Sequence, residues 1–389
     1  MSSRIRSSRR TFLATSAGAL LAGSAAEGPK KGQGRDAETK LAAAREGGAG
    51  QRRVRNRVGA VAYGYQYSIG LFSYRDRPGE RFDAVRVVEA VRQAGGEVLQ
   101  LYYSMIDKLD EAELARLRCR ARELDVMLEV HGGGALRRTY ERAMHKAAAV
   151  GSKVVGCSFG MLMRPEKIPT LKQWDEHVAR CEARLRELVP VAKSLKIRIG
   201  VENHLDFTVE ELRDLMRRVD SPHVGVIFDV GNTVGTLDDP IEAADILGPY
   251  TVATHYKDFA IEEVTRGFRF TMVPLGCGSL RLREITERLL KHIDPEMGLS
   301  IEMMNGQHFE VKWLEDRFWI PYRNKSARQV AATLRHIRGK AIDIDEFILQ
   351  EEVDKLPHEE HIRFEQERMT RCIAYLKGLL DDTQKPLPV

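Results

Sequence analysis

The sequence predicts an α/β fold, a (β/α)8 TIM barrel followed by a C-terminal helical extension. From about residue 56 to 310, short apolar runs alternate eight times with stretches whose apolar residues recur at helical spacing. Four successive runs also end in a carboxylate or an imidazole, and parallel barrel strands converge at their C-terminal ends. A doubly wound sheet is the alternative, but eight regular units favour closure into a barrel.

Each unit has a strand and a helix that can be placed by residue type. The strands are expected at 58–63, 98–102, 126–130, 154–157, 197–201, 224–228, 250–254 and 299–301. The helices between them are expected at 81–94, 110–124, 136–150, 171–195, 209–219, 240–247 and 280–293. Asp110 is placed to cap the second helix, and Gly151 is a stop signal for the third.

Residues 311–389 exceed a minimal barrel, and we assign them to the C-terminal extension. Helical patterns continue over 326–338 and 359–380. An aromatic cluster follows the last strand and is compatible with a lid, a dimer contact or packing on the barrel: Trp313, Phe318, Trp319 and Tyr322. A homo-oligomer is therefore left open.

The four strand-end side chains are Glu202, Asp229, His255 and Glu302. The first two intervals, 27 and 26 residues, fit one βα unit each, and the third, 47 residues, fits one unit plus an inserted loop. One such carboxylate alone is often an ordinary polar group, but four in phase on one face predict a metal site. Three carboxylates and one imidazole are hard ligands, which favour Mn²⁺, Mg²⁺, Co²⁺ or Zn²⁺, with Mn²⁺ our first expectation.

At these positions the sequence resembles the sugar isomerase/epimerase superfamily of xylose isomerase-like TIM barrels. The matching stretches, within residues 56–310, are 201–204, 228–232, 255–258, 274–278 and 301–304. The resemblance implies a metal that binds two neighbouring oxygens of a sugar or keto-sugar and stabilises an enediolate. It makes Glu202 and Glu302 both metal ligands and the catalytic acid/base pair, with Asp229 and His255 as further ligands.

Five neighbouring residues are candidates for substrate binding: His131, His204, Asn232, Lys257 and Asp258. His204 and Lys257 each follow a ligand by two residues, so an extended strand would point them to the same side. A salt bridge between Lys257 and Asp258 is the alternative for that pair. Ketose 3-epimerases of this superfamily usually carry a histidine where Asn232 stands and an arginine where Ile261 stands, so free-ketose epimerisation does not follow directly.

The N-terminal residues are strongly basic, whereas the rest of the chain is mildly acidic. The net charge is +5, but residues 1–56 carry 12 Lys/Arg and 4 Asp/Glu, which leaves the remainder at −3. An acidic body argues against a nucleic-acid partner. Arg9-Arg10-Thr11-Phe12-Leu13 and the small apolar residues that follow predict a twin-arginine signal peptide at 1–26, then a linker at 27–55. We therefore expect export by the twin-arginine machinery to the periplasm or the exterior.

These features together predict a metal-dependent sugar isomerase/epimerase. Its expected substrate is a non-phosphorylated sugar, keto-sugar or cyclitol, since no phosphate-cradling glycine loop is present in the sequence. A lyase or dehydratase of a keto-sugar or inosose type is the first alternative, because the same enediolate can expel a β-substituent. A non-catalytic sugar-binding barrel is the second.

Overall fold

A computed structural model describes residues 56–132, 137–159, 164–304, 307–323, 325–338 and 350–383. The predicted twin-arginine signal at 1–26 and the linker at 27–55 lie outside these residues, so both stay predictions. None of the helices within the described ranges is long and apolar enough to cross a membrane.

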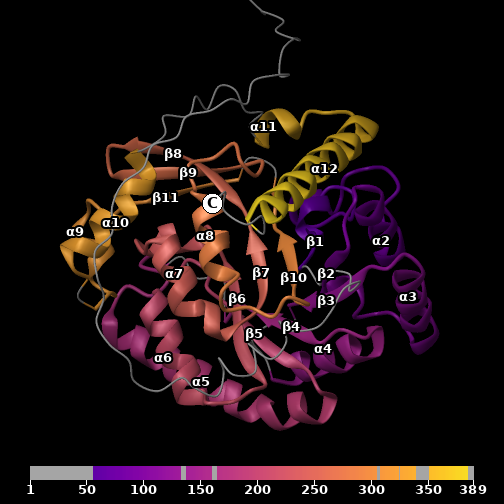
Figure 1. The fold of residues 1–389 in the computed structure, drawn as a ribbon, viewed down its shortest axis with the longest axis horizontal. Coiled ribbons are helices and arrows are strands. Elements are labelled where there is room, and N and C mark those ends of the chain that lie inside the picture. Colours follow the sequence, from indigo (N-terminus) through magenta and orange to yellow (C-terminus); the bar gives the residue numbers. More distant parts are fainter. Residues whose placement is uncertain are drawn as a thin grey trace, which may run out of the picture. The chain divides into compact units, whose positions relative to one another are not determined.

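In the described part of the chain, eight parallel strands close into a barrel, as predicted (Figure 1). They are β1 (Arg57–Val61), β2 (Val98–Tyr102), β3 (Met127–His131), β4 (Val154–Cys157), β5 (Arg198–Glu202), β6 (Val224–Asp229), β7 (Thr251–Tyr256) and β10 (Gly298–Ile301). Neighbours in sequence are neighbours in the barrel, and β10 pairs with both β7 and β1. The C-terminal ends of all eight strands therefore surround one face.

The helices that follow the first seven barrel strands cover the outside. They are α2 (Ala84–Gln93), α3 (Glu111–Glu123), α4 (Arg137–Val150), α5 (Leu171–Leu195), α6 (Val209–Val219), α7 (Pro240–Leu247) and α8 (Leu282–Leu289). Asp110 caps α3 as predicted, in a reciprocal pair with Glu113. Gly151 follows α4 with φ +84°, which only glycine adopts without strain.

The long interval after His255 contains strand structure where we expected only an inserted loop. Strands β8 (Asp258–Val264) and β9 (Gly267–Val273) form an antiparallel hairpin, and β11 (His308–Val311) adds to β9. The Phe-Arg-Phe-Thr-Met-Val stretch of β9 alternates between the two sheet faces, so period-two patterning was present in the sequence. This small sheet lies beyond the C-terminal ends of the barrel strands.

The C-terminal region contains α9 (Asp316–Trp319), α10 (Ala327–Arg338), α11 (Gln350–Val353) and α12 (His358–Thr383). Both predicted helical patterns are confirmed by α10 and α12. Helix α12 packs against β1 and α8, so it covers the barrel between its last and first strands (Figure 1, yellow). In the aromatic cluster, Phe318 and Tyr322 are buried and stack with ring centroids 5.1 Å apart, which supports the packing interpretation.

Candidate functional site

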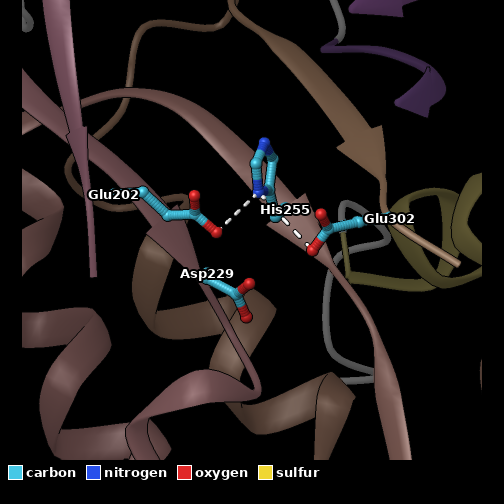
Figure 2. Close-up of side chains that lie close together, drawn as sticks. All are labelled: Glu202, Asp229, His255 and Glu302. Carbon is cyan, nitrogen blue, oxygen red and sulfur yellow. Dashed lines mark hydrogen bonds and ion pairs between the residues drawn. The ribbon is translucent and has the colours of Figure 1, made fainter. Parts of the chain in front are cut away.

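Strand register brings the four predicted metal ligands together. Asp229 pairs with His255 across β6 and β7, and Ser300 of β10 pairs with His255 from the other side. Glu302 follows β10, and Glu202 ends β5. All four side chains are buried, and one ligand atom from each lies within 4.8 Å of the others. Figure 2 shows the three carboxylates and the imidazole pointing toward one another.

Two polar residues inside the barrel orient His255. Its Nε2 lies 2.7 Å from Oε1 of Gln100, and Nε2 of Gln100 donates to Glu129 at 3.0 Å. Because the amide oxygen is an acceptor, Nε2 of His255 carries a proton. Its Nδ1 then faces Oε1 of Glu202 at 3.2 Å and Oε2 of Glu302 at 3.7 Å. Nδ1 is thus the ring nitrogen presented to the other ligands.

Asp229 is held from its backbone and from one carboxylate oxygen. Its N–H and C=O exchange 2.8 Å hydrogen bonds with the Asn203 side chain, and its Oδ1 accepts from the N–H groups of Gly231 and Asn232. Its Oδ2 has no hydrogen bond in the described residues but lies 2.5 Å from Nζ of Lys257. The Lys257 ammonium also contacts Glu302. A positive group therefore sits among the buried carboxylates.

Burial and mutual attraction shift the pKa values in opposite directions. Burial raises the pKa of Asp229 to about 6, although Lys257 acts against this. Burial opposes the charge of Glu302, but Lys257 and His255 lower its pKa below the ordinary value. Burial opposes the charge of His255 as well, yet Glu302 and Glu202 raise its pKa to about 9. Attraction between the charges therefore outweighs burial at Glu302 and His255, whereas burial outweighs it at Asp229.

These residues fit a divalent cation. Three carboxylates and a neutral imidazole Nδ1 form a hard ligand set of the kind that binds Mn²⁺ or Mg²⁺. The Lys257 ammonium pairs with Oδ2 of Asp229 and with Glu302, so these carboxylates already stabilise a positive charge at this position.

A cavity of about 410 Å³ opens onto the cluster, a normal size for a small-molecule site. Four of the five predicted substrate-binding residues line it: His131, His204, Asn232 and Lys257. Several polar atoms around it are buried and have no hydrogen bond within the described ranges: both ring nitrogens of His131, Nδ1 of His204, Nδ2 of Asn232 and Oε1 of Gln307. Buried polar atoms without partners are costly, so they mark where ligand oxygens can bind.

His131 has room beside the cavity because the residue paired with it on the neighbouring strand is a glycine. Gly156 of β4 pairs with His131, and a Cβ at Gly156 would lie 2.2 Å from Cδ2 of the imidazole. Nε2 of His131 lies 3.3 Å from Oε2 of Glu202, but without hydrogen-bond alignment. The ring is therefore placed beside Glu202 while remaining free to bind a ligand.

Asp258, the fifth predicted substrate residue, does not line this cavity. Its fully buried carboxylate accepts hydrogen bonds from the backbone N–H groups of Phe259, Gly276, Gly278 and Leu280. A Cβ on Gly278 would lie 2.0 Å from Oδ1 of Asp258, which explains the glycine there. The structure gives Asp258 the role of a clamp on the 274–280 loop, and it forms no salt bridge with Lys257.

The family description of the xylose isomerase-like TIM barrel matches residues 88–335. The chain belongs to this family. Its relatives include the 3-oxo-isoapionate decarboxylase of Pectobacterium atrosepticum, which is 28% identical over 197 residues that cover 50% of this chain and 68% of that protein.

Two solved structures share the fold. A D-psicose 3-epimerase crystallised with D-fructose aligns with a TM-score of 0.54 and 16% identity, over 83% of this chain and 99% of its own. An L-ribulose 3-epimerase aligns with a TM-score of 0.53 and 15% identity, over 85% and 96%. These structures support the xylose isomerase-like barrel as a fold.

In this xylose isomerase-like barrel, several cavity residues escaped the sequence-based prediction. Tyr63 lies two residues after β1 and Tyr102 ends β2, and Tyr63 donates a 2.9 Å hydrogen bond to Tyr102. Their strand-end position was a usable signal. Gln100 and Glu129, which support His255, were also detectable as polar residues inside apolar strands. Asp354 lines the cavity from the C-terminal region, and no local pattern pointed to it.

Proposed function

We propose that this protein is a metal-dependent sugar isomerase or epimerase that acts through an enediolate. The observation that carries the proposal is the buried cluster of Glu202, Asp229, His255 and Glu302 beside a ligand-sized cavity. Sugar epimerases share the fold, which is consistent with a sugar-modifying enzyme. We place the reaction at the carbon next to a substrate carbonyl.

The cluster residues would hold the cation, which supplies Lewis-acid polarisation of substrate oxygens when bound. Glu202 and Glu302 are the acid/base pair in this proposal, because both line the cavity and both belong to the cluster. Both are ionised near neutral pH, since their pKa values are lowered. One takes the proton from carbon, and the other returns a proton.

The chemistry of the cavity favours an uncharged sugar. Among the described residues, its lining includes the carboxylates Glu202, Glu302 and Asp354 and one ammonium, that of Lys257. No excess of positive side chains is available to hold a phosphate group. The unpartnered imidazole and amide atoms of His131, His204 and Asn232 suit hydroxyl and carbonyl oxygens.

A lyase is the second candidate, and one relative favours it. The Pectobacterium atrosepticum protein is a decarboxylase, and loss of CO₂ beside a carbonyl leaves the same kind of enediolate. Lys257 lies in the cavity, where an ammonium can pair with a substrate carboxylate. Product analysis separates the two candidates, because only the lyase releases a fragment.

The test is turnover of a panel of ketoses and keto-sugar acids in D₂O by Mn²⁺-loaded protein, followed by NMR. We expect deuterium at the carbon beside the carbonyl. Glu202→Gln and Glu302→Gln should each lower the rate by about 10²–10⁴-fold, because they keep an oxygen but remove the base. Glu262→Gln is the matched control, since Glu262 lies on β8 outside the cavity and pairs with Arg269.

Two results would contradict the proposal. Unimpaired turnover by both glutamine variants would remove these glutamates as acid and base. Turnover without cleavage of a C–H or C–C bond beside the carbonyl would reject the enediolate route. Such turnover would show no deuterium in the product and no isotope effect when the substrate is labelled at that carbon.

A further inference from the structure

A second cavity, of about 480 Å³, lies next to the one at the metal-ligand cluster. It is formed by the 164–169 segment, the face of the small sheet at Phe270 and Val311, and the 315–320 segment around α9. Its size falls within the range of small-molecule sites. The proposed reaction gives it no role.

The two cavities share a wall and a sheet face. Leu205 lines both of them. Phe309 of β11 lines the first, and its partner across the β9–β11 ladder, Phe270, lines the second, with ring centroids 5.3 Å apart. Val311 stands two residues from Phe309 and therefore on the same face of the sheet. The two cavities therefore adjoin along this face of the sheet.

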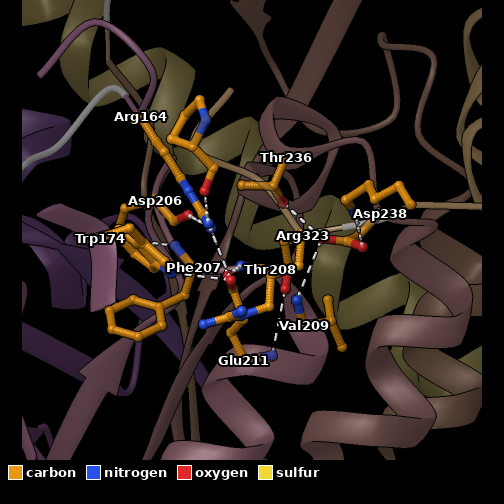
Figure 3. Close-up of polar contacts among 12 residues, drawn as sticks. Arg164, Trp174, Asp206, Phe207, Thr208, Val209, Glu211, Thr236, Asp238 and Arg323 are labelled. Atoms are coloured by element: carbon orange, nitrogen blue, oxygen red, sulfur yellow. Dashed lines mark hydrogen bonds and ion pairs between the residues drawn. The ribbon is translucent and has the colours of Figure 1, made fainter. Parts of the chain in front are cut away.

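The second cavity is a built site, because a fully buried arginine anchors its wall. The guanidinium of Arg164 bonds to the Glu211 carboxylate at 2.5 and 3.0 Å and donates to the backbone oxygen of Pro321 at 2.6 Å (Figure 3). It lies between the Trp174 and Tyr322 rings, 3.7 and 4.1 Å from their centroids. Its Nε is buried without a hydrogen-bond partner in the described residues.

The lining of the second cavity favours an uncharged polar molecule. Its acidic and basic side chains balance: Glu166, Glu310 and Glu315 against Arg164, Lys312 and Arg317. Two of these pairs already neutralise each other, Lys312 with Glu166 at 2.8 Å and Arg317 with Glu315 at 2.5 Å. Apolar walls with a polar rim match a sugar ring, which has C–H faces and hydroxyl edges.

We propose that the second cavity binds a second sugar unit, joined by a glycosidic bond to the sugar that reacts at the cluster. The natural substrate class is then a keto-disaccharide or related glycoside. This rests on the proposed function for the identity of the reacting unit, but the binding step is separate from the chemistry and can be measured without turnover.

The test compares sugar affinities by calorimetry, using the full chain loaded with Mn²⁺. The probes are D-fructose and three keto-disaccharides that differ in linkage, namely turanose, lactulose and palatinose. At least one disaccharide should bind tenfold or more tightly than D-fructose. D-fructose 6-phosphate should gain nothing over D-fructose, because the lining carries no net charge.

Two variants that fill the second cavity sharpen the test. Ile320→Trp adds bulk at a residue that lines the cavity and is 55% exposed, and Val311→Phe fills it from the sheet. Each should lower the ratio of disaccharide to D-fructose affinity at least tenfold. Leu314→Trp is the matched control, because Leu314 is 57% exposed in the same segment but lines neither cavity. It should leave the ratio unchanged.

The proposal is overturned if no keto-disaccharide binds more tightly than D-fructose, or if both cavity-filling variants keep the wild-type ratio. These outcomes are distinct from failure of the proposed function. Selective disaccharide binding without deuterium exchange would reject the enediolate chemistry and retain the second subsite. Deuterium exchange into D-fructose without any preference for disaccharides would support the enediolate chemistry and reject the second subsite.

Discussion

Gln100 shows how one buried amide can orient a candidate metal ligand. It accepts from Nε2 of His255 and donates to Glu129, so it fixes both the ring orientation and the tautomer of the imidazole. Neither Gln100 nor Glu129 belongs to the four-residue cluster. They still affect cation binding, because they determine that Nδ1 of His255 is the nitrogen that faces the cluster.

We expect Gln100→Leu to weaken Mn²⁺ binding by about 10–100-fold, since it removes the acceptor that orients His255. Calorimetric titration of metal-free protein measures this. Gln93→Leu makes the same change at an exposed position of α2 and should bind Mn²⁺ as wild type does. Wild-type affinity in Gln100→Leu would show that His255 is oriented by other contacts.

His255 also predicts a pH dependence for the metal-free protein. Its pKa is raised to about 9 by Glu302 and Glu202, above the ordinary 6.5. A raised histidine pKa stabilises the fold below about pH 6.5, and this contribution is lost as the pH rises toward 9. The free energy of unfolding should therefore fall between pH 7 and 9, by at most about 1.4 kcal/mol per pH unit.

Urea unfolding at a series of pH values measures the slope, and His255→Gln is the comparison that isolates it. The variant should show a flatter profile over the same range, whatever its absolute stability. Equal slopes in the two proteins would mean that His255 is not protonated in the metal-free fold.

Among the elements, α12 does more than cover the barrel. The buried Glu365 carboxylate accepts from the backbone N–H of Tyr67 at 2.8 Å, and from the N–H and hydroxyl of Ser68 at 3.0 and 2.7 Å. The segment that Glu365 holds continues to Phe72 and Tyr74, which line the cavity beside the four-residue cluster. Helix α12 thereby positions one wall of the site.

We expect Glu365→Ala to lower the free energy of unfolding by about 2–4 kcal/mol, because three hydrogen bonds to a buried carboxylate are lost together. Glu367→Ala is the control on the same helix, where the side chain is 70% exposed and pairs only loosely with Arg363. It should change stability by less than about 0.5 kcal/mol. Chemical denaturation compares the two, and equal losses would reject the clamp.

Taken as a whole, the molecule divides into features that the sequence could and could not reveal. The barrel and the grouping of the four strand-end side chains were predictable, because parallel strands are buried runs and their ends share one face. The β8–β9–β11 sheet was missed because its third strand lies 35 residues after β9, so no local pattern joins them. The backbone contacts of Asp258 could not be predicted, because its partners lie 18 to 22 positions later in the chain.

The twin-arginine signal stays a prediction from Arg9 and Arg10, which lie outside the described residues.

The contact between Glu365 and Tyr67 joins residues 298 positions apart in the chain. During synthesis, the first strand and its loop leave the ribosome long before the helix that secures them. The loop after β1 is therefore synthesised long before its partner on α12. A nascent chain that stops short of residue 365 lacks the contact that holds this wall of the cavity. Contacts of such long range also slow folding, because the chain must close a large loop before they form. The clamp on this wall of the cavity can therefore form only after residue 365 has been synthesised.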